Sequence, residues 1–432
     1  MATAAALALA AVGVGCGNKG SGDIKPEGSG PGTGAEPTEW RVGAYFSLSG
    51  EDTAFGVDSR EGIELAVDEI NKAGGIKKKP MKVLFEDDKS KPDEANNKVL
   101  QLIDRDKVVA LLGEVASSRS RAGGIVANKK KIPMITPSST NPDVTRIGPF
   151  VFRVCFTDDV QGQMGAEFVV NKLGKKKIAI LYASDDLYSS GLAKEFRDYT
   201  KKIGGEIVIE KSFLKKETNF TTYINEVVSA KPDIIYAPIY YNAMVPIAQQ
   251  AKAVGVKGDM FIGGDGWDSD VLLRDAGNEM EGAYFTNHYA PDVPWPHAKE
   301  FLSKYQERFK RTPTSLAAQA YDAARLLADA MSRAKTDTPE GIRDAIAATK
   351  DFAGATGNIS INAERNPDKA VVIVRIKDKK FTYYSMVNEK AAGAASSAAP
   401  GASAAPAAGS AAPAASAAPA ASAAPAAPPV KK

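Results

Sequence analysis

The strongest constraint on this chain is a repeated alternation of short apolar segments with helix-like segments. Segments typical of buried strands occur at 41–48, 81–87, 108–113, 133–138, 177–184, 207–214, 233–240 and 260–265. Helix-like stretches separate them, and the first carries apolar residues at helical spacing: Ile63, Ala66, Val67 and Ile70. Nearly continuous apolar strands that alternate with helices predict parallel sheets covered by helices on both faces.

The length of this region predicts two such sheets. Residues 40–390 exceed the roughly 250–300 residues at which single cores stop growing. They also hold about twice as many strand–helix units as one sheet needs, so we expect an α/β protein with two doubly wound lobes. After residue 289 the pattern changes to long helices at 296–310 and 315–334, and a hairpin at 371–387 turns at Asp378-Lys379.

The two ends of the chain differ from this region. An uncharged Ala/Leu/Val run ends at Cys16 and predicts a secretory signal peptide over 1–16, with an apolar disordered N-terminus as the alternative. Residues 17–39 are rich in Gly, Pro and Ser and predict a flexible tether. The Ala/Pro/Ser-rich residues 391–432 predict a disordered tail.

Composition argues against several classes of protein. The chain has 55 basic and 52 acidic residues, which gives no electrostatic footprint for nucleic acid. No apolar run reaches the roughly 18 residues typical of a membrane-spanning helix. The chain has no G-x-S-x-G elbow of serine hydrolases, no Walker loop, and no G-x-G-x-x-G that opens a helix after a strand, as in dinucleotide-binding folds. We therefore expect no nucleic-acid partner and no cofactor, although catalysis by carboxylates stays open.

The histidines and cysteines offer little chemistry. The chain has two histidines, His288 and His297, which we expect at the surface or at a lobe edge. Cys155 lies in an apolar run and is expected to be a core residue. Two histidines and one core cysteine cannot build the usual zinc sites, so we expect no metal.

Polar residues follow several of the predicted strands, where open α/β sheets bind ligands. In the first half Ser117 follows one strand, and Ser138, Ser139 and Thr140 follow the next. Hydroxyls and free backbone N–H groups at helix N-termini form anion sites, although each could equally be a plain helix cap. Two such groups on neighbouring strands could converge on one carboxylate.

The second half offers the complementary chemistry. Tyr188, Tyr240 and Asp265 each follow a predicted strand. Glycines around Asp265 would let a ligand approach the backbone closely. Asp265 could be a helix cap, or together with the tyrosines it could hold an ammonium group. A carboxylate site on one lobe and an ammonium site on the other predict a receptor for an amino acid zwitterion.

These residues lie in stretches that resemble the leucine/isoleucine/valine-binding proteins of bacterial ABC transporters. The resemblance covers about 41–387 and rests on several stretches together. They are Gly50 with Phe55-Gly56, GIELAVDEINKAGGI (62–76), EDDKSKPDEA (86–95), MITPSST (134–140), FVFRVCFTDDVQG (150–162), DLYSSGLAKEF (186–196) and FIGGDGW (261–267). The segment ending at Cys16 resembles a lipoprotein signal, in which the cysteine is lipidated.

The resemblance implies the type I periplasmic binding-protein fold, with two lobes joined by three crossings and the ligand between them. The lobes would comprise 40–157 plus 288–368 and 158–287 plus 369–388. The implied ligand-binding residues are Ser117, Ser139 and Thr140 for the carboxylate, Ser138 through its backbone, Asp265 for the ammonium with Tyr188 and Tyr240, and Phe55 and Trp267 for the side chain. Asp265 stands where leucine-binding members carry Glu.

The expected function is that of a lipid-anchored, periplasmic, monomeric protein that captures a neutral apolar, branched-chain amino acid for an ABC permease. It would act by binding and lobe closure, without catalysis. The alternatives are a ligand-binding sensory module, a binding protein for an amide- or urea-type molecule, and an enzyme that uses carboxylates between the lobes.

Overall fold

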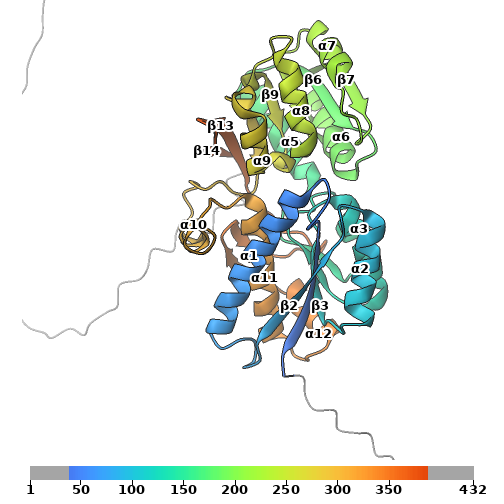
Figure 1. The fold of residues 1–432 in the computed structure, drawn as a ribbon, viewed down its shortest axis with the longest axis vertical. Helices are drawn as coiled ribbons and strands as arrows, with labels where there is room; N and C mark the ends of the chain where they lie inside the picture. Colours follow the sequence, from blue (N-terminus) through green and yellow to red (C-terminus); the bar gives the residue numbers. More distant parts are fainter. Residues whose placement is uncertain (1–37, 388–432) are drawn as a thin grey trace, which may run out of the picture. The chain divides into compact units, whose positions relative to one another are not determined.

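The computed structural model describes residues 38–387. The predicted signal peptide with Cys16, nearly all of the predicted tether and the tail at 391–432 lie outside the described residues. The described chain forms two α/β lobes, each built on its own sheet (Figure 1). Between residues 38 and 387, no helix is both long enough and apolar enough to cross a membrane.

Lobe 1 is built on a five-stranded parallel sheet in the order β2-β1-β3-β4-β5. Its strands are β1 (Trp40–Phe46), β2 (Met81–Asp87), β3 (Ala110–Leu112), β4 (Met134–Thr136) and β5 (Val151–Arg153). Its helices are α1 (Thr53–Lys72), α2 (Pro92–Asp104), α3 (Ser117–Lys130), α4 (Asp143–Arg146), α10 (Pro296–Phe309), α11 (Ser315–Arg333) and α12 (Pro339–Ala347). Helix α1 packs on α11 and helix α2 on α3, and these pairs cover opposite faces of the sheet (Figure 1).

Lobe 2 is built on a seven-stranded sheet in the order β14-β13-β10-β9-β8-β6-β7. Its strands are β6 (Lys177–Ala183), β7 (Glu206–Phe213), β8 (Ile234–Ala237), β9 (Phe261–Gly263), β10 (Tyr284–Asn287), β13 (Val371–Lys377) and β14 (Lys380–Val387). Its helices are α5 (Asp158–Glu167), with the π-helical turn η1 (Phe168–Lys172), α6 (Leu187–Lys202), α7 (Thr221–Ser229), α8 (Tyr241–Lys252) and α9 (Asp270–Asp275). Strands β13 and β14 join antiparallel, so the sheet is mixed at one edge.

The chain passes between the two sheets three times. It leaves lobe 1 after β5, returns after β10, and leaves again after the small hairpin β11 (Phe352–Gly354) and β12 (Gly357–Ile359). The predicted α/β fold with two doubly wound lobes and three crossings is confirmed.

Close packing in lobe 1 depends on a glycine between two helices. A Cβ added to Gly62 of α1 would lie 2.1 Å from the backbone oxygen of Ala317 on α11. Real Cβ atoms do not approach an oxygen that closely, so α1 and α11 can pack at this distance because residue 62 has no side chain.

The hairpin predicted at 371–387 turns where the sequence indicated. Asp378 and Lys379 have φ of 52° and 57°, and a two-residue hairpin turn of type I′ requires positive φ at both positions.

The lengths of two strands in lobe 1 differ from prediction. Strands β3 and β4 are shorter than the apolar segments that contain them, because a buried loop residue is as apolar as a buried strand residue.

Candidate functional site

The candidate residues lie at the carboxyl ends of the parallel strands. Ser117 and Ser138 follow β3 and β4 in lobe 1, and Tyr188, Tyr240 and Asp265 follow β6, β8 and β9 in lobe 2. In lobe 1, strand β1 lies between β2 and β3, the two strands that follow it in the chain. In lobe 2, strand β6 lies in the same way between β7 and β8. The order of strands reverses there, and open α/β sheets bind ligands at such a point, outside the carboxyl ends of the strands.

Asp265 is the centre of the polar contacts in lobe 2. It opens the 3₁₀ turn η3 (Asp265–Trp267) and is 5% exposed. Its Oδ1 accepts hydrogen bonds from Tyr188 Oη and Gln161 Nε2, each at 2.9 Å. Its Oδ2 lies 3.3 Å from His288 Nε2. When His288 is neutral, these partners orient the carboxylate without neutralising it, so its charge can attract an ammonium group.

Aromatic rings form an apolar wall beside this carboxylate. The rings of Tyr188 and Tyr240 stack with centroids 4.9 Å apart and planes 5° apart. Phe55, which belongs to α1 of lobe 1, meets Tyr240 edge-on at 5.5 Å. Burial and the nearby Asp265 raise the pKa of Tyr188 well above its ordinary value, so its hydroxyl is a neutral donor.

The hydroxyl residues lie at the facing edge of lobe 1. Ser117 Oγ accepts the backbone N–H of Asn141 at 3.3 Å. The Ser138 hydroxyl is buried and has no hydrogen-bond partner among residues 38–387. Thr140 is buried, and its carbonyl accepts the N–H of Asp158 at 2.9 Å. A buried hydroxyl without a partner is costly, so Ser138 is available to an acceptor such as a carboxylate.

The side chain of Ser139 does not join this set. Its hydroxyl contacts the carbonyls of Glu114 and Val115 at 3.0 and 2.7 Å and Ser120 Oγ at 2.6 Å. The hydroxyl therefore satisfies backbone groups at the end of β3. This differs from the expectation that the Ser139 side chain faces a ligand carboxylate.

Trp267 also lies apart from the other candidates. It is fully buried, its ring packs against Gly263, and it is tilted against Phe285 at 6.2 Å. A Cβ added to Gly263 would lie 2.2 Å from the indole, so the ring fills the space that this glycine leaves. Trp267 is part of the core of lobe 2, and the structure does not bring it into the wall formed by Phe55 and Tyr240.

Direct contacts join the two lobes around the site. Asn141 Nδ2 of lobe 1 donates to the carbonyl of Leu187 in lobe 2 at 3.0 Å. Tyr241 Oη of lobe 2 donates to the carbonyl of Glu51 at 3.1 Å, and Lys215 Nζ lies 2.8 Å from Glu51 Oε1. The candidate residues of the two lobes are therefore held facing one another.

A buried charged cluster beside the aromatic wall was not predicted from the sequence. The Arg119 side chain is 1% exposed and lies 2.7 Å from Asp52 and 3.1 Å from Glu114. Burial and Glu114 raise the pKa of Asp88 to about 8. Lys215 of lobe 2 approaches Asp52 at 3.6 Å. In the sequence these residues resemble ordinary surface charges, and only their positions next to helix starts at the carboxyl edge could have indicated a role.

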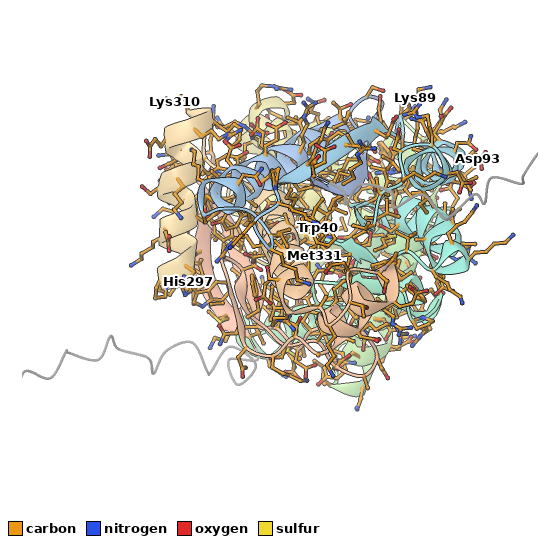
Figure 2. All side chains as sticks on the ribbon, turned by 90° about the horizontal axis from the view of Figure 1, so that it is seen from below. Trp40, Lys89, Asp93, His297, Lys310 and Met331 are labelled. Atoms are coloured by element: carbon orange, nitrogen blue, oxygen red, sulfur yellow. The ribbon has the colours of Figure 1, made fainter. Side chains whose placement is uncertain are left out.

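His288 was expected at the surface or at a lobe edge; it lies at a lobe edge, directly after β10, and the surface alternative is wrong because the side chain is buried. The residue is 1% exposed, and its ring stacks on Phe156 with centroids 3.6 Å apart. Burial lowers the pKa of His288, although Asp265 opposes this effect. His297 lies half-exposed on α10, as expected (Figure 2). Cys155 is buried as predicted, and burial raises the pKa of its thiol to about 12.

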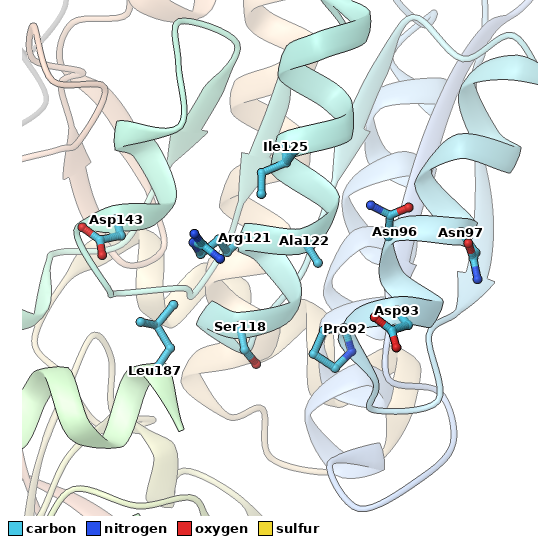
Figure 3. Close-up of a pocket in the computed structure, with 10 residues that line it drawn as sticks. All are labelled: Pro92, Asp93, Asn96, Asn97, Ser118, Arg121, Ala122, Ile125, Asp143 and Leu187. Carbon is cyan, nitrogen blue, oxygen red and sulfur yellow. The ribbon is translucent and has the colours of Figure 1, made fainter. Parts of the chain in front are cut away.

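An open groove of about 770 Å³ lies beside the candidate site (Figure 3). Its lining residues are Pro92, Asp93, Asn96, Asn97, Ser118, Arg121, Ala122, Ile125, Asp143 and Leu187. Ser118 and Leu187 are the chain neighbours of Ser117 and Tyr188, and both face the same hollow (Figure 3). The groove is therefore adjacent to the candidate site and does not include it.

Comparison with known proteins identifies the family. A family model described as "Periplasmic binding protein" matches residues 39–381. An "Amino acid binding protein" from Pseudomonas aeruginosa is 29% identical over 61% of this chain and 71% of its own length. A "Leu/Ile/Val-binding protein homolog 3" from Brucella melitensis is 27% identical over 74% of this chain and 86% of its own length.

Two solved structures extend the likeness to the fold. The leucine binding protein LivK from Thermotoga maritima is 33% identical, with a TM-score of 0.77 over 81% of this chain and 99% of its own. The branched-chain amino acid transporter substrate binding protein LivJ from Streptococcus pneumoniae, in complex with isoleucine, is 32% identical. Its TM-score is 0.76 over 81% of this chain and 99% of its own. As the resemblance predicted, this chain belongs to the periplasmic binding protein family, in its branch of substrate-binding proteins of branched-chain amino acid ABC transporters.

Proposed function

We propose that the protein captures a neutral, apolar amino acid between its lobes and delivers it to the permease of an ABC importer. The observation that carries the proposal is the buried Asp265 carboxylate, whose partners Tyr188, Gln161 and neutral His288 leave its charge uncompensated. Burying such a charge is costly unless a positive group approaches it. The ammonium of an amino acid is such a group, and capture requires no catalytic step.

The facing edge of lobe 1 supports a carboxylate at the other end of the ligand. Ser138 offers a buried hydroxyl without a partner among the described residues, and Ser117 begins the 14-residue helix α3. Free N–H groups at the start of a helix favour an anion. We propose that Ser117, Ser138 and Thr140 bind the ligand carboxylate, and that Ser139 supports the loop from within lobe 1.

The side-chain end of the ligand is proposed to meet the aromatic wall. Phe55 and Tyr240 offer an apolar surface contributed by both lobes. The relatives named for leucine, isoleucine and valine, and the structure in complex with isoleucine, support a branched-chain side chain. Trp267 would act indirectly, by filling the core beneath Gly263.

We further propose how the protein is placed in the cell. Cys16 would carry a lipid that anchors the periplasmic protein to a bacterial membrane, and the tether at 17–39 would give a reach on the order of 25 Å. The protein would work as a monomer. Closure would bring together lobes bounded at residues 40–157 plus 288–368 and 158–287 plus 369–388, and the permease would recognise the closed form.

Thermal unfolding of the full chain against the twenty amino acids, urea and short amides tests this function. A ligand that binds the folded state alone, at 100 times its Kd, adds about 2.7 kcal/mol of stability. We expect leucine, isoleucine or valine to raise the midpoint. A rise with urea or an amide but with no amino acid would overturn the zwitterion assignment. Copurification with a kinase rather than a permease would favour the sensory alternative.

A further inference from the structure

His288 contacts the carboxylate on which the proposed function depends. It follows β10 directly, at the second crossing between the lobes, and its side chain is fully buried. Its Nε2 lies 3.3 Å from Asp265 Oδ2. Because an ionised carboxylate only accepts hydrogen bonds, the proton in this contact belongs to Nε2.

The partners of Asp265 show which oxygen remains for a ligand. Oδ1 already accepts from Tyr188 and Gln161, whereas the structure shows one partner for Oδ2, His288. An ammonium group that approaches Asp265 therefore shares Oδ2 with the imidazole. The other ring nitrogen, Nδ1, is buried and has no hydrogen-bond partner among residues 38–387. A second proton on the ring would have no acceptor there, which favours the neutral imidazole.

The ring is also fixed by its position at the crossings. It stacks on Phe156, which precedes the first crossing, at 3.6 Å and 27° between planes. Lys369 is buried just before β13, at the third crossing. Its positive charge lowers the pKa of His288, because it repels a protonated imidazole. Phe156 from the first crossing and Lys369 from the third thus face the imidazole, and both its burial and Lys369 disfavour its protonation.

We propose that His288 is a positioning residue that orients Asp265 toward a ligand ammonium and makes capture of the ligand depend on its own protonation. With a neutral imidazole the pair carries one negative charge, which complements an ammonium. With a protonated imidazole the pair is neutral, so the ammonium group finds no net negative charge and is repelled by the imidazolium. This inference rests on the proposed function, because it concerns the same ammonium site.

Other ionisable groups near the pair must be separated from this effect. Asp265 and Lys369 face His288, and Asp158, Cys155, Tyr188, Tyr236 and Asp268 face Asp265. Burial raises the pKa of Asp268 to about 6, so this carboxyl also titrates in weakly acidic solution. A variant that removes only the titration of His288 is therefore needed.

The first test is the affinity for L-leucine between pH 4 and 8 in the wild type and in His288→Gln. Glutamine can place an N–H near the position of Nε2 but does not titrate in this range. We expect wild-type affinity to fall as the pH is lowered through the depressed pKa of His288, with a tenfold fall per pH unit as the limit for one linked proton. In His288→Gln that fall should largely disappear. An equal fall in both proteins, or no fall in the wild type, would overturn the proposal.

The second test needs no ligand. The chain has two histidines, so NMR titration of tag-free protein gives two imidazole signals, and His297→Gln identifies the exposed one. We expect His288 to titrate below the ordinary histidine range, and lower still in Asp265→Asn, which lacks the carboxylate. Unchanged titration in Asp265→Asn would overturn the coupling. A shifted titration without binding of any amino acid would instead overturn the proposed function.

Discussion

Asp265 is the side chain on which recognition of the ammonium depends. The substitution Asp265→Asn removes the negative charge. It preserves the size of the side chain and still allows its oxygen to accept from Tyr188 and Gln161. Losing one partner of a buried charge pair costs about 2–5 kcal/mol, so leucine affinity should fall at least about 30-fold, as measured by calorimetry. Asp275→Asn, on the surface of lobe 2, is the matched control. Wild-type affinity in Asp265→Asn would contradict the assignment.

Arg119 is expected to stabilise the fold rather than recognise the ligand. It is the counter-charge within lobe 1 for the buried Asp52 and Glu114. Arg119→Leu should lower the free energy of unfolding by about 3–5 kcal/mol at neutral pH, because it leaves buried carboxylates unpaired. The loss should shrink as the pH falls, because protonation removes the unpaired charge. Chemical denaturation at pH 5 and pH 8 checks both points, and a loss that does not depend on pH would contradict this explanation.

The site residues that could be foreseen are those set by position along a strand. Asp265, Tyr188 and Tyr240 were predicted because they follow strands, and the structure brings them together with Phe55, although their roles in binding stay predictions. His288 and Arg119 could not be foreseen in this way. Whether an ionisable side chain is buried depends on partners distant in sequence, and a local pattern does not contain that information.

Among the helices and strands, the packing of α1 on α11 makes the sharpest prediction. Alanine favours a helix over glycine by about 1 kcal/mol, so propensity alone would make Gly62→Ala stabilising. The added Cβ would meet the Ala317 backbone, and such overpacking costs about 1–3 kcal/mol. We expect net destabilisation in urea unfolding, with the exposed Lys72→Ala as control. A more stable Gly62→Ala would contradict the packing described here.

The long periodic segments were the most predictable parts of the fold. Strand β2 and helices α10 and α11 lie within a residue of the expected bounds, because their patterns run over many residues. Strand β5 and the hairpin of β11 and β12 were not predicted. Each strand has three residues, too few for a period to be read, and β5 is paired through tertiary contact with β4.

For the protein as a whole, the contacts between the lobes predict how closure is stabilised. Lys215 of lobe 2 is ion-paired with Glu51 and approaches Asp52, whereas Lys211 pairs with Glu226 within lobe 2. Lys215→Met should favour separated lobes and weaken leucine binding on the order of tenfold, because capture requires closure. Lys211→Met should leave binding unchanged.

Small-angle scattering of the ligand-free proteins measures the same effect directly. Lys215→Met is expected to be more expanded than the wild type, and the Lys211→Met control is not. Equal dimensions and equal leucine affinity in the two variants would show that the contacts of Lys215 do not hold the lobes together.

Asp265 and the aromatic wall together predict that the protein recognises an amino acid by its ammonium group as well as by its side chain. The most direct test is calorimetric titration of the full chain with L-leucine and with 4-methylpentanoate, which lacks the ammonium group but keeps the rest of the molecule. We predict that leucine binds and that 4-methylpentanoate binds at least about 100-fold more weakly, because Asp265 is left without its partner. Equal binding of the two ligands, or binding of 4-methylpentanoate alone, would show that the protein does not recognise the ammonium group.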